Sequence, residues 1–223
     1  MSKPRLLLAD DHPLILEGLR RVLEPEFEIV GVAANGREVV AETIRLRPDA
    51  VLLDVGMPEL NGIEAARQIK REVSSTKIIF VTQVDDRAYA RAAFQAEASA
   101  YLVKQSVVEE LAVAVREALA GRFYVSASLR HGFLDGRFTP ETNPAALLNE
   151  HLTPRQREVL QLVAEGKSGK EIAGALDISL KTVEFHKSSI MQELGIHTVA
   201  ELTRYAIQHG IILPPPLDPP TRE

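Results

Sequence analysis

The sequence contains no cysteine, and this absence removes several classes of chemistry. Disulfide bonds, thiolate metal sites and cysteine nucleophiles are excluded, and a cytoplasmic location fits such a chain best. No uninterrupted apolar stretch approaches the ~18 residues that a membrane-spanning helix needs. The apolar run after "MSKPR" is too short for the core of a signal peptide. We therefore expect a soluble protein that is neither exported nor membrane-bound.

The sequence also lacks an excess of positive charge. Its net charge is −5; residues 1–120 carry 15 basic and 19 acidic side chains, and residues 151–213 carry 7 of each. Neither part has the strong basic surplus that is often seen in nucleic-acid-binding proteins. Binding to DNA would therefore depend on where individual charges lie, and the overall balance argues against it.

The first 120 residues contain a regular alternation of two patterns. Short aliphatic runs are separated by segments in which apolar residues recur at intervals of three and four, as they do in amphipathic helices. The runs are Leu6–Ala9, Ile29–Ala33, Ala50–Leu53, Ile78–Val81 and Ala100–Val103. Five buried strands alternating with five helices predict an α/β domain with a five-stranded parallel sheet, doubly wound and flavodoxin-like.

The alternation ends after Gly121, so we assign residues 1–121 to this first domain. Residues 122–149 contain scattered Gly, Pro, Ser and Asn, which predicts a linker with at most one short helix. Residues 150–213 show helical spacing and no strand pattern, which predicts a small all-α domain. Residues 214–223 are rich in proline, which cannot continue a helix, so we expect a disordered tail.

Polar side chains stand at the carboxyl ends of the predicted strands. They are Asp10 and Asp11 after the first strand, Asp54 after the third, Thr82 at the end of the fourth and Lys104 after the fifth. Ligands of parallel α/β sheets bind outside these strand ends, so we expect the side chains to line one cleft. Three carboxylates with one lysine leave surplus negative charge, and oxygen ligands suit Mg²⁺ better than Zn²⁺.

Such a cleft is suited to phosphoryl transfer. A carboxylate beside magnesium can attack a phosphoryl group and form an acyl phosphate. The metal and the Lys104 ammonium would balance the charge on the transferred oxygens, and the Thr82 hydroxyl would hydrogen-bond one of them. Each residue alone is compatible with an ordinary loop or cap. Their occurrence at the ends of different strands, in chain order, favours the chemical interpretation.

The segments "LLLADDH", "VLLDVGMPELNG", "IIFVT" and "AYLVK" resemble the receiver domain of bacterial two-component response regulators, over about residues 4–120. The resemblance implies that Asp54 accepts a phosphoryl group. It implies that Mg²⁺ is held by Asp10, Asp11, Asp54 and the backbone carbonyl of Gly56. It also implies phosphoryl-binding roles for Thr82 and Lys104, and a change of ring orientation on activation for Tyr101.

The stretch "LTPRQREVLQLVAEGKSGKEIAGALDISLKTVEFHKSSIMQELGI" predicts a helix-turn-helix. Thr153 and Pro154 form an N-cap and first-turn pair that opens a helix, and Gly166 ends it. A short helix over residues 170–176, the turn "DIS" and a longer helix over residues 180–194 follow. A second helix that is exposed on one side can enter the major groove of DNA.

On the longer helix, Val183, Ile190 and Leu194 share the side expected to pack inward, with His186 as a hydrogen-bonded residue at the core edge. Phe185 lies among polar residues on the opposite side, where it could touch a thymine methyl. Alternatively, the first domain or a partner chain covers Phe185. The predicted DNA-binding residues are Lys170, Lys181, Thr182, Glu184, Phe185, Lys187 and Ser188.

The segments "LTPRQREVL", "GKSGKEIA" and "KTVEFHKSSIMQELG" together resemble the LuxR-type helix-turn-helix that ends NarL/FixJ response regulators, over about residues 150–213. Relatives commonly carry Asn at Gly169, so we expect a weaker cap on the short helix there. Relatives of the first domain usually carry glycine at Glu97 and Ala100. A side chain at either position strains the backbone only where φ is positive.

The leading interpretation is a phosphorylation-controlled transcription regulator, with no enzymatic activity beyond its own phosphorylation and dephosphorylation. Its expected partners are a sensor histidine kinase, double-stranded DNA and, when phosphorylated, a second copy of the chain. A single unit without net positive charge makes few phosphate contacts, which favours the dimer.

One alternative is an aspartate-nucleophile phosphohydrolase, but Gly56 stands where its general acid is usually found. The other is a phosphorylation-gated module that binds RNA or protein; the scarcity of stacking aromatics argues against single-stranded RNA.

Overall fold

The computed structural model describes residues 2–129 and 152–213. The chain divides into an N-terminal unit, Met1–Leu148, and a C-terminal unit, Asn149–Glu223. The predicted tail at 214–223 and residues 130–149 of the predicted linker lie outside the described residues. The limits of the predicted domains at residues 121 and 150 therefore stay predictions.

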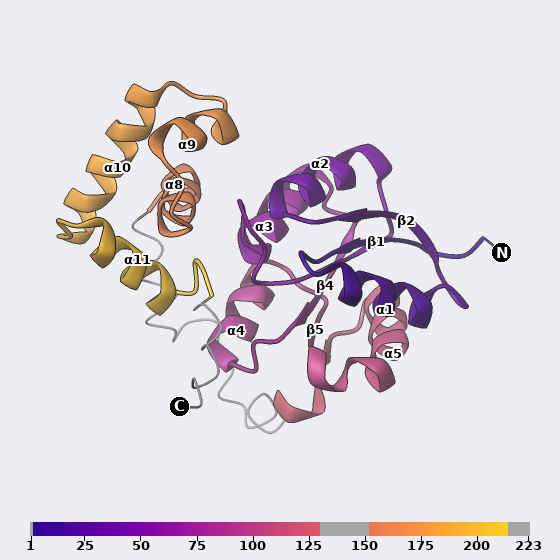
Figure 1. The fold of residues 1–223 in the computed structure, drawn as a ribbon. Coiled ribbons are helices and arrows are strands. Elements are labelled where there is room, and N and C mark those ends of the chain that lie inside the picture. The colour runs from indigo at the N-terminus through magenta and orange to yellow at the C-terminus, as the bar shows by residue number, and fades with distance from the viewer. Residues whose placement is uncertain (1, 130–151, 214–223) are drawn as a thin grey trace, which may run out of the picture. The chain divides into compact units, whose positions relative to one another are not determined.

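The N-terminal unit is built on a sheet whose strands run in the order β2-β1-β3-β4-β5-β6 (Figure 1). The strands are β1 (Arg5–Ala9), β2 (Glu28–Ala33), β3 (Ala50–Leu53), β4 (Lys77–Thr82), β5 (Ala100–Val103) and β6 (Tyr124–Val125). All neighbouring strands are parallel, which confirms the predicted type of sheet. The predicted number of strands is wrong, because β6 adds a sixth inside the stretch assigned to a linker. A strand of two residues is too short to show a periodic pattern.

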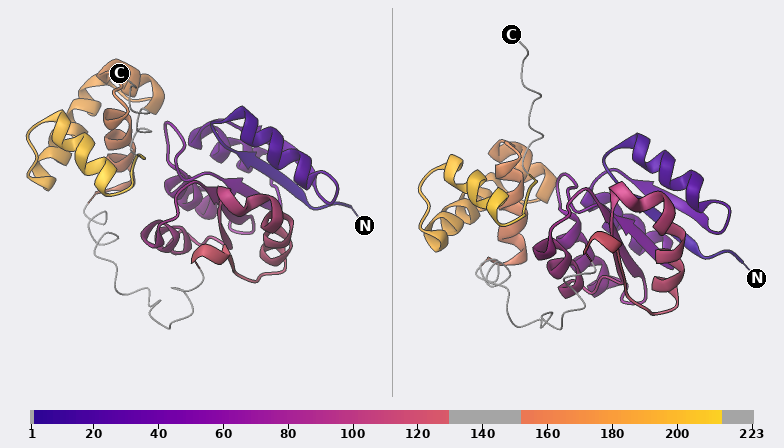
Figure 2. Two further views of the ribbon diagram at one scale, coloured as in Figure 1. Left: turned by 60° about the horizontal axis from the view of Figure 1, so that its bottom comes forward. Right: turned by 90° about the horizontal axis from the view of Figure 1, so that it is seen from below.

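Helices cover both faces of the sheet, as Figures 1 and 2 show. The helices over one face are α2 (Gly36–Leu46), α3 (Gly62–Glu72) and α4 (Arg87–Gln95), and those over the other are α1 (Pro13–Leu23) and α5 (Val107–Leu119). Each face has its own cluster of buried apolar side chains. β3, β4 and β5 are buried almost throughout, which explains why these strands appear in the sequence as continuous apolar runs.

Gly62 allows α3 to begin directly against the end of β3. A Cβ atom at this position would lie 2.0 Å from the backbone oxygen of Asp54. The N–H of Gly62 also donates to the carbonyl of Val55 at 2.9 Å, and the side chain of Asn61 caps the helix by accepting from the N–H of Glu64. The first residue of α3 therefore packs against the backbone of Asp54 and Val55 and fixes its position.

The two positions where glycine was expected behave differently. Glu97 follows α4 with φ of 61°, in the left-handed region that disfavours a side chain. The N–H of Ala98 donates to the carbonyl of Ala93 at 3.0 Å, so the chain at Glu97 makes the turn that glycine usually makes after a helix. Ala100 is a fully buried residue of β5 and has no positive φ. Strain is therefore present at Glu97 and not at Ala100.

The C-terminal unit is helical in its described part and has one apolar core. Its helices are α8 (Pro154–Ala164), α9 (Gly169–Leu176), α10 (Leu180–Leu194) and α11 (Val199–Gln208). Asp177 ends α9 with φ of 51°, and Ser179 caps α10, so three residues make the tight turn between them. Across the described residues, no helix is long and apolar enough to cross a bilayer.

The structure corrects the expectation about Gly169. Ser168 is the N-cap of α9, and Ser168 and Glu171 form a reciprocal capping box. Gly169 is the first helical residue, so its lack of a side chain does not remove the cap. A Cβ there would lie 2.7 Å from Cδ1 of Leu180 and 3.3 Å from Oε1 of Glu184, so the glycine permits close packing of α9 against α10.

Candidate functional site

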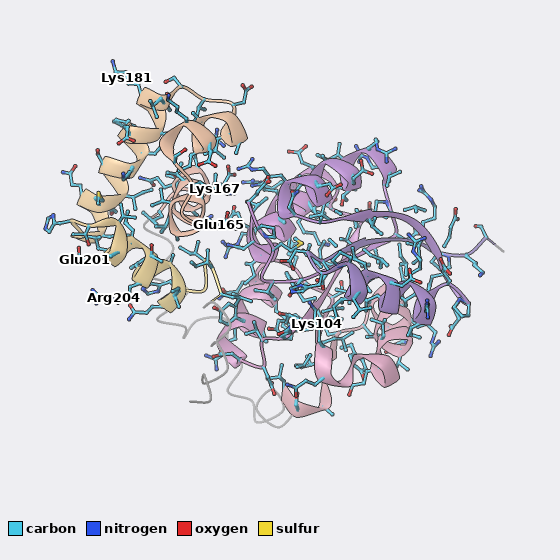
Figure 3. All side chains as sticks on the ribbon, in the orientation of Figure 1. Lys104, Glu165, Lys167, Lys181, Glu201 and Arg204 are labelled. Atoms are coloured by element: carbon cyan, nitrogen blue, oxygen red, sulfur yellow. The ribbon has the colours of Figure 1, made fainter. Side chains whose placement is uncertain are left out.

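The ends of β1, β3 and β5 bring three charged side chains into direct contact. Nζ of Lys104, immediately after β5, lies 2.5 Å from Oδ2 of Asp10 and 2.8 Å from Oδ2 of Asp54. β1 pairs with β3 in register, and Asp10 and Asp54 are the next residues of the two strands. Figure 3 marks Lys104 in the N-terminal unit. The sheet therefore brings together three of the five side chains that the strand-end pattern placed in one cleft: Asp10, Asp54 and Lys104.

The cluster is shielded from water. Asp10 is 1% exposed and Asp54 is 5% exposed. Burial alone would lower the pKa of Lys104, but Asp54 and Asp10 beside the ammonium outweigh it and raise the pKa of Lys104 above its usual value. The lysine therefore keeps its positive charge in the pocket. Its charge offsets only one of the two buried carboxylates.

Asp11 lies at the rim of this pocket together with His12. The side chain of Asp11 is 34% exposed, and Nδ1 of His12 lies 2.7 Å from Oδ1 of Asp11 and 3.2 Å from Oδ1 of Asp10. Within the described residues, Asp10, Asp11 and His12 form a group whose possible metal-binding atoms all lie within 4.8 Å of one another. His12 is not among the site residues predicted from the sequence, where its place directly after the acidic pair is the only signal.

The donor set fits a hard divalent cation. A carboxylate oxygen of the buried Asp10 and one of the more exposed Asp11 lie within 4.8 Å of each other, and Asp54 lies across Lys104 from Asp10. The N–H of Gly56 is 3.4 Å from Oδ1 of Asp54, so this loop residue lies against the same carboxylate. Carboxylate oxygens with room for water are the ligands that Mg²⁺ prefers.

Thr82 and Tyr101 are linked through the loop after β4. The hydroxyl of Thr82 accepts from the N–H of Val84 at 3.3 Å, and the hydroxyl of Tyr101 donates to the carbonyl of Val84 at 2.8 Å. Both side chains are fully buried, and burial together with the nearby Asp54 raises the pKa of Tyr101. Val84, in the loop after β4, therefore connects Thr82 at the carboxyl end of β4 to the hydroxyl of Tyr101.

In the C-terminal unit, α10 has the two sides that its sequence predicts. Val183 and Ile190 are buried, whereas Phe185 is 69% exposed. The other exposed candidates are Lys170 of α9 and Lys181, Glu184 and Ser188 of α10, while Thr182 and Lys187 are partly buried. Figure 3 shows Lys181 projecting outward from the start of α10.

Two details of α10 were not predicted. The hydroxyl of Thr182 lies 2.8 Å from that of Ser179, so Thr182 takes part in the start of the helix as well as lying on its candidate side. A pocket of about 130 Å³ beside α10 is lined by Lys167, Glu184 and Lys187, among others. Lys167 is exposed and adds a cation next to the candidate side, in a loop where no helical pattern could identify it.

Comparisons with known proteins agree with this two-part organisation. Residues 6–116 match the family model described as "Response regulator receiver domain". Residues 150–206 match the model described as "Bacterial regulatory proteins, luxR family".

Similar proteins match over nearly the whole chain. The transcriptional regulatory protein MctR of Rhizobium johnstonii is 34% identical, covering 94% of this chain and 96% of MctR. The transcriptional regulatory protein LiaR of Bacillus subtilis is 37% identical, covering 93% and 99%. A solved structure of the RcsB response regulator of Salmonella typhimurium matches with a TM-score of 0.61 and 27% identity, covering 94% and 99%. Another RcsB structure is described as two dimers bound to two parallel DNAs, with a TM-score of 0.54, 27% identity and coverage of 92% and 98%.

Proposed function

Because this chain belongs to the NarL-family response regulators, which join a receiver domain to a LuxR-type DNA-binding domain, we propose that phosphorylation of Asp54 by a sensor histidine kinase controls its binding to DNA. The observation that supports this most directly is the contact of the Lys104 ammonium with Asp54 and Asp10 in a buried pocket. An exposed carboxylate would not be held in position in this way.

The pocket supplies the parts that transfer to Asp54 needs. A carboxylate oxygen of Asp54 attacks phosphorus, the bond from phosphorus to the donor breaks, and the released histidine of the kinase regains its proton. Lys104 already contacts Oδ2 of Asp54, so its charge is in place to stabilise the transferred oxygens. Thr82 stands at the end of β4, next to β5 in the sheet, where its hydroxyl can bind one of these oxygens.

We assign the metal site to Asp10, Asp11 and Asp54 with the carbonyl of Gly56. When bound, Mg²⁺ supplies positive charge that offsets the charge of the phosphoryl oxygens. Asp10 is held by Lys104 and by the N–H of His12, which donates to Oδ1 at 2.9 Å. Asp11 is more exposed than Asp10, so an ion would enter the site from the side on which Asp11 lies.

The C-terminal unit would read DNA through α10. Its exposed side offers Lys181 for phosphates and Glu184 and Phe185 for base edges. The unit has no net positive charge, so two copies acting together would supply the phosphate contacts that one lacks. The dimers of RcsB on DNA support a homodimer here too. We place this activity in the cytoplasm, where a bacterial regulator meets DNA.

The test is phosphorylation of the full chain by acetyl phosphate in magnesium. Asp54→Asn should take up no phosphoryl group, because the nucleophile is lost. Asp49→Asn is the matched control: Asp49 stands just before β3, at the opposite end of the strand, where its carboxylate accepts from the N–H of Arg5 at 2.7 Å. Equal labelling of wild type and Asp54→Asn would disprove the assignment.

A further inference from the structure

One buried hydroxyl connects β6 to the residue before Lys104. β6 pairs with β5, and the N–H of Ser126 donates to the carbonyl of Tyr101 at 3.0 Å. The chain then enters a helical turn over residues 127–129, so β6 does not continue alongside β5. The hydroxyl of Ser126 instead accepts from the N–H of Val103 at 3.1 Å. This side chain extends the pairing by one hydrogen bond.

The same hydroxyl also reaches α5. Oγ of Ser126 donates to Oε2 of Glu110 at 2.9 Å, and the N–H of Ala127 donates to Oε1 of Glu110 at 3.4 Å. Val103 ends β5 and Glu110 lies in α5, so Lys104 stands in the chain between them. Ser126 therefore links the two ends of the segment that carries Lys104, at Val103 and at Glu110.

The bond between Ser126 and Val103 is buried, whereas the bonds to Glu110 are partly or fully exposed. Ser126 is 0% exposed, and hydrogen bonds kept from water are stronger than exposed ones. Three residues further on, Leu129 is 3% exposed and belongs to the same apolar cluster as Tyr101. The segment 124–129 is thus attached both to Tyr101 and to the neighbour of Lys104. It is also the segment from which the chain continues toward the C-terminal unit.

We propose that Ser126 and Glu110 are positioning residues for phosphoryl transfer to Asp54. They hold the backbone around Lys104 so that its ammonium meets Asp54, and they attach this backbone to the segment after β6. This inference rests on the proposed function, because the chemistry at Asp54 is what the two residues serve. Neither touches a reacting atom; Ser126 acts through the backbone of Val103, and Glu110 acts through Ser126.

The variants to compare in the full chain are Ser126→Ala, Ser126→Thr and Glu110→Ala. Thr76→Val is the matched control, because Thr76 is 1% exposed and its hydroxyl donates to the carbonyl of Pro48 at 2.9 Å. Ser126→Ala and Thr76→Val each remove one buried hydroxyl from the same unit. Thr76 precedes β4, at the end of the sheet away from the pocket.

Three measurements report on the bridge. They are hydrogen exchange at the amide of Val103, the NMR resonance of Nζ of Lys104 in ¹⁵N-lysine-labelled protein, and the rate of phosphorylation by acetyl phosphate in magnesium. In Ser126→Ala we expect exchange at Val103 to become about tenfold faster, since the amide loses its acceptor. The Lys104 resonance should shift and phosphorylation should slow. Ser126→Thr keeps a hydroxyl and should leave all three measurements close to those of wild type. Glu110→Ala should change them less than Ser126→Ala does.

Thr76→Val should lower the melting temperature and leave the three measurements unchanged. The proposal is overturned if Ser126→Ala leaves the Lys104 resonance and the phosphorylation rate as in wild type, or if Thr76→Val changes them equally. Should Ser126→Ala fail to fold, Glu110→Ala decides, because Glu110 is only partly buried. If wild type takes up no phosphoryl group, the proposed function fails, and the Val103 and Lys104 measurements still decide whether Ser126 positions the lysine.

Discussion

The pocket of the N-terminal unit and the exposed side of α10 are built in opposite ways. In the pocket, Asp10, Asp54 and Lys104 come from different strands and are held by their contacts with one another. On α10, the candidate residues come from a single helix, and Phe185 projects with 69% of its surface exposed. The pocket is therefore defined before any ligand arrives. The exposed side chains of α10 have few contacts within the unit, so under the proposed function DNA would supply most of them.

This difference determines how each surface should respond to substitution. A buried charge that loses its partner has no water to replace it, so changes in the pocket should have large effects. An exposed side chain loses only what it contributes to the complex, so changes on α10 should be graded and should separate affinity from specificity. The predictions below test this contrast, from the largest expected effect to the smallest.

The largest effect is expected for magnesium binding. Asp11→Ala should weaken Mg²⁺ about tenfold or more, because a carboxylate ligand is lost. Thr82→Ala should change it much less, since the Thr82 hydroxyl is not one of the proposed metal ligands. A calorimetric titration of each variant with Mg²⁺ measures which of the two loses more affinity. A stronger effect of Thr82→Ala would mean that the cleft is misassigned.

The next effect concerns sequence preference. Phe185→Ala and Glu184→Ala should each cost ~1–3 kcal/mol of discrimination between DNA sites, with less change in non-specific affinity. Phe123→Ala is the control, because Phe123 is 76% exposed but belongs to the N-terminal unit. Selection of binding sites from random DNA, at one salt concentration, measures the preference. If both α10 variants select the wild-type motif as strongly as wild type, α10 does not read bases through these residues.

A smaller and different effect is expected for Lys181. Lys181→Ala should weaken binding to all DNA sequences alike and reduce the slope of log affinity against log salt by about one unit. Lys3→Ala removes a lysine from the N-terminal unit and serves as the control. Gel shifts over a salt series give both slopes. A loss confined to one DNA sequence would instead make Lys181 a base-reading residue.

The smallest effect concerns stability. Glu97→Gly should raise the free energy of unfolding by about 1 kcal/mol, because glycine adopts a positive φ without steric cost. Ala100→Gly is its counterpart: Ala100 lies in a buried strand, so the change should destabilise. Urea denaturation of the two variants measures whether each change raises or lowers the free energy of unfolding. Destabilisation by Glu97→Gly would show that the Glu97 side chain contributes more than its backbone conformation costs.

The sequence predicted the pocket more completely than the details around it. Asp10, Asp54 and Lys104 were predictable because parallel strands end at one edge of a sheet, so their positions in the pattern already place them together. The exposed side of α10 was predictable because helical spacing puts Val183 and Ile190 on one side of the helix and Phe185 on the other. The roles of these residues in phosphorylation and DNA binding stay predictions.

Other features had no periodic signal. β6 is formed by two residues and depends on β5 being available as a partner, so composition alone assigned it to a linker. Ser126 reads as an ordinary loop serine, and only its three-dimensional neighbours Val103 and Glu110 distinguish it. The positive φ of Glu97 likewise depends on how α4 meets β5. Each depends on a contact between distant parts of the chain.

The place of β6 in the sheet has a consequence for the solubility of fragments. With β6 present, the edge of the sheet beside β5 is a strand of only two residues, and short edges resist pairing with other molecules. A fragment that ends at residue 121 would leave β5 itself as the edge, with its buried apolar residues and unpaired backbone groups available to other copies. A fragment that ends at residue 129 keeps β6 and Leu129 in place. Light scattering should therefore show that the shorter fragment aggregates more readily than the longer one.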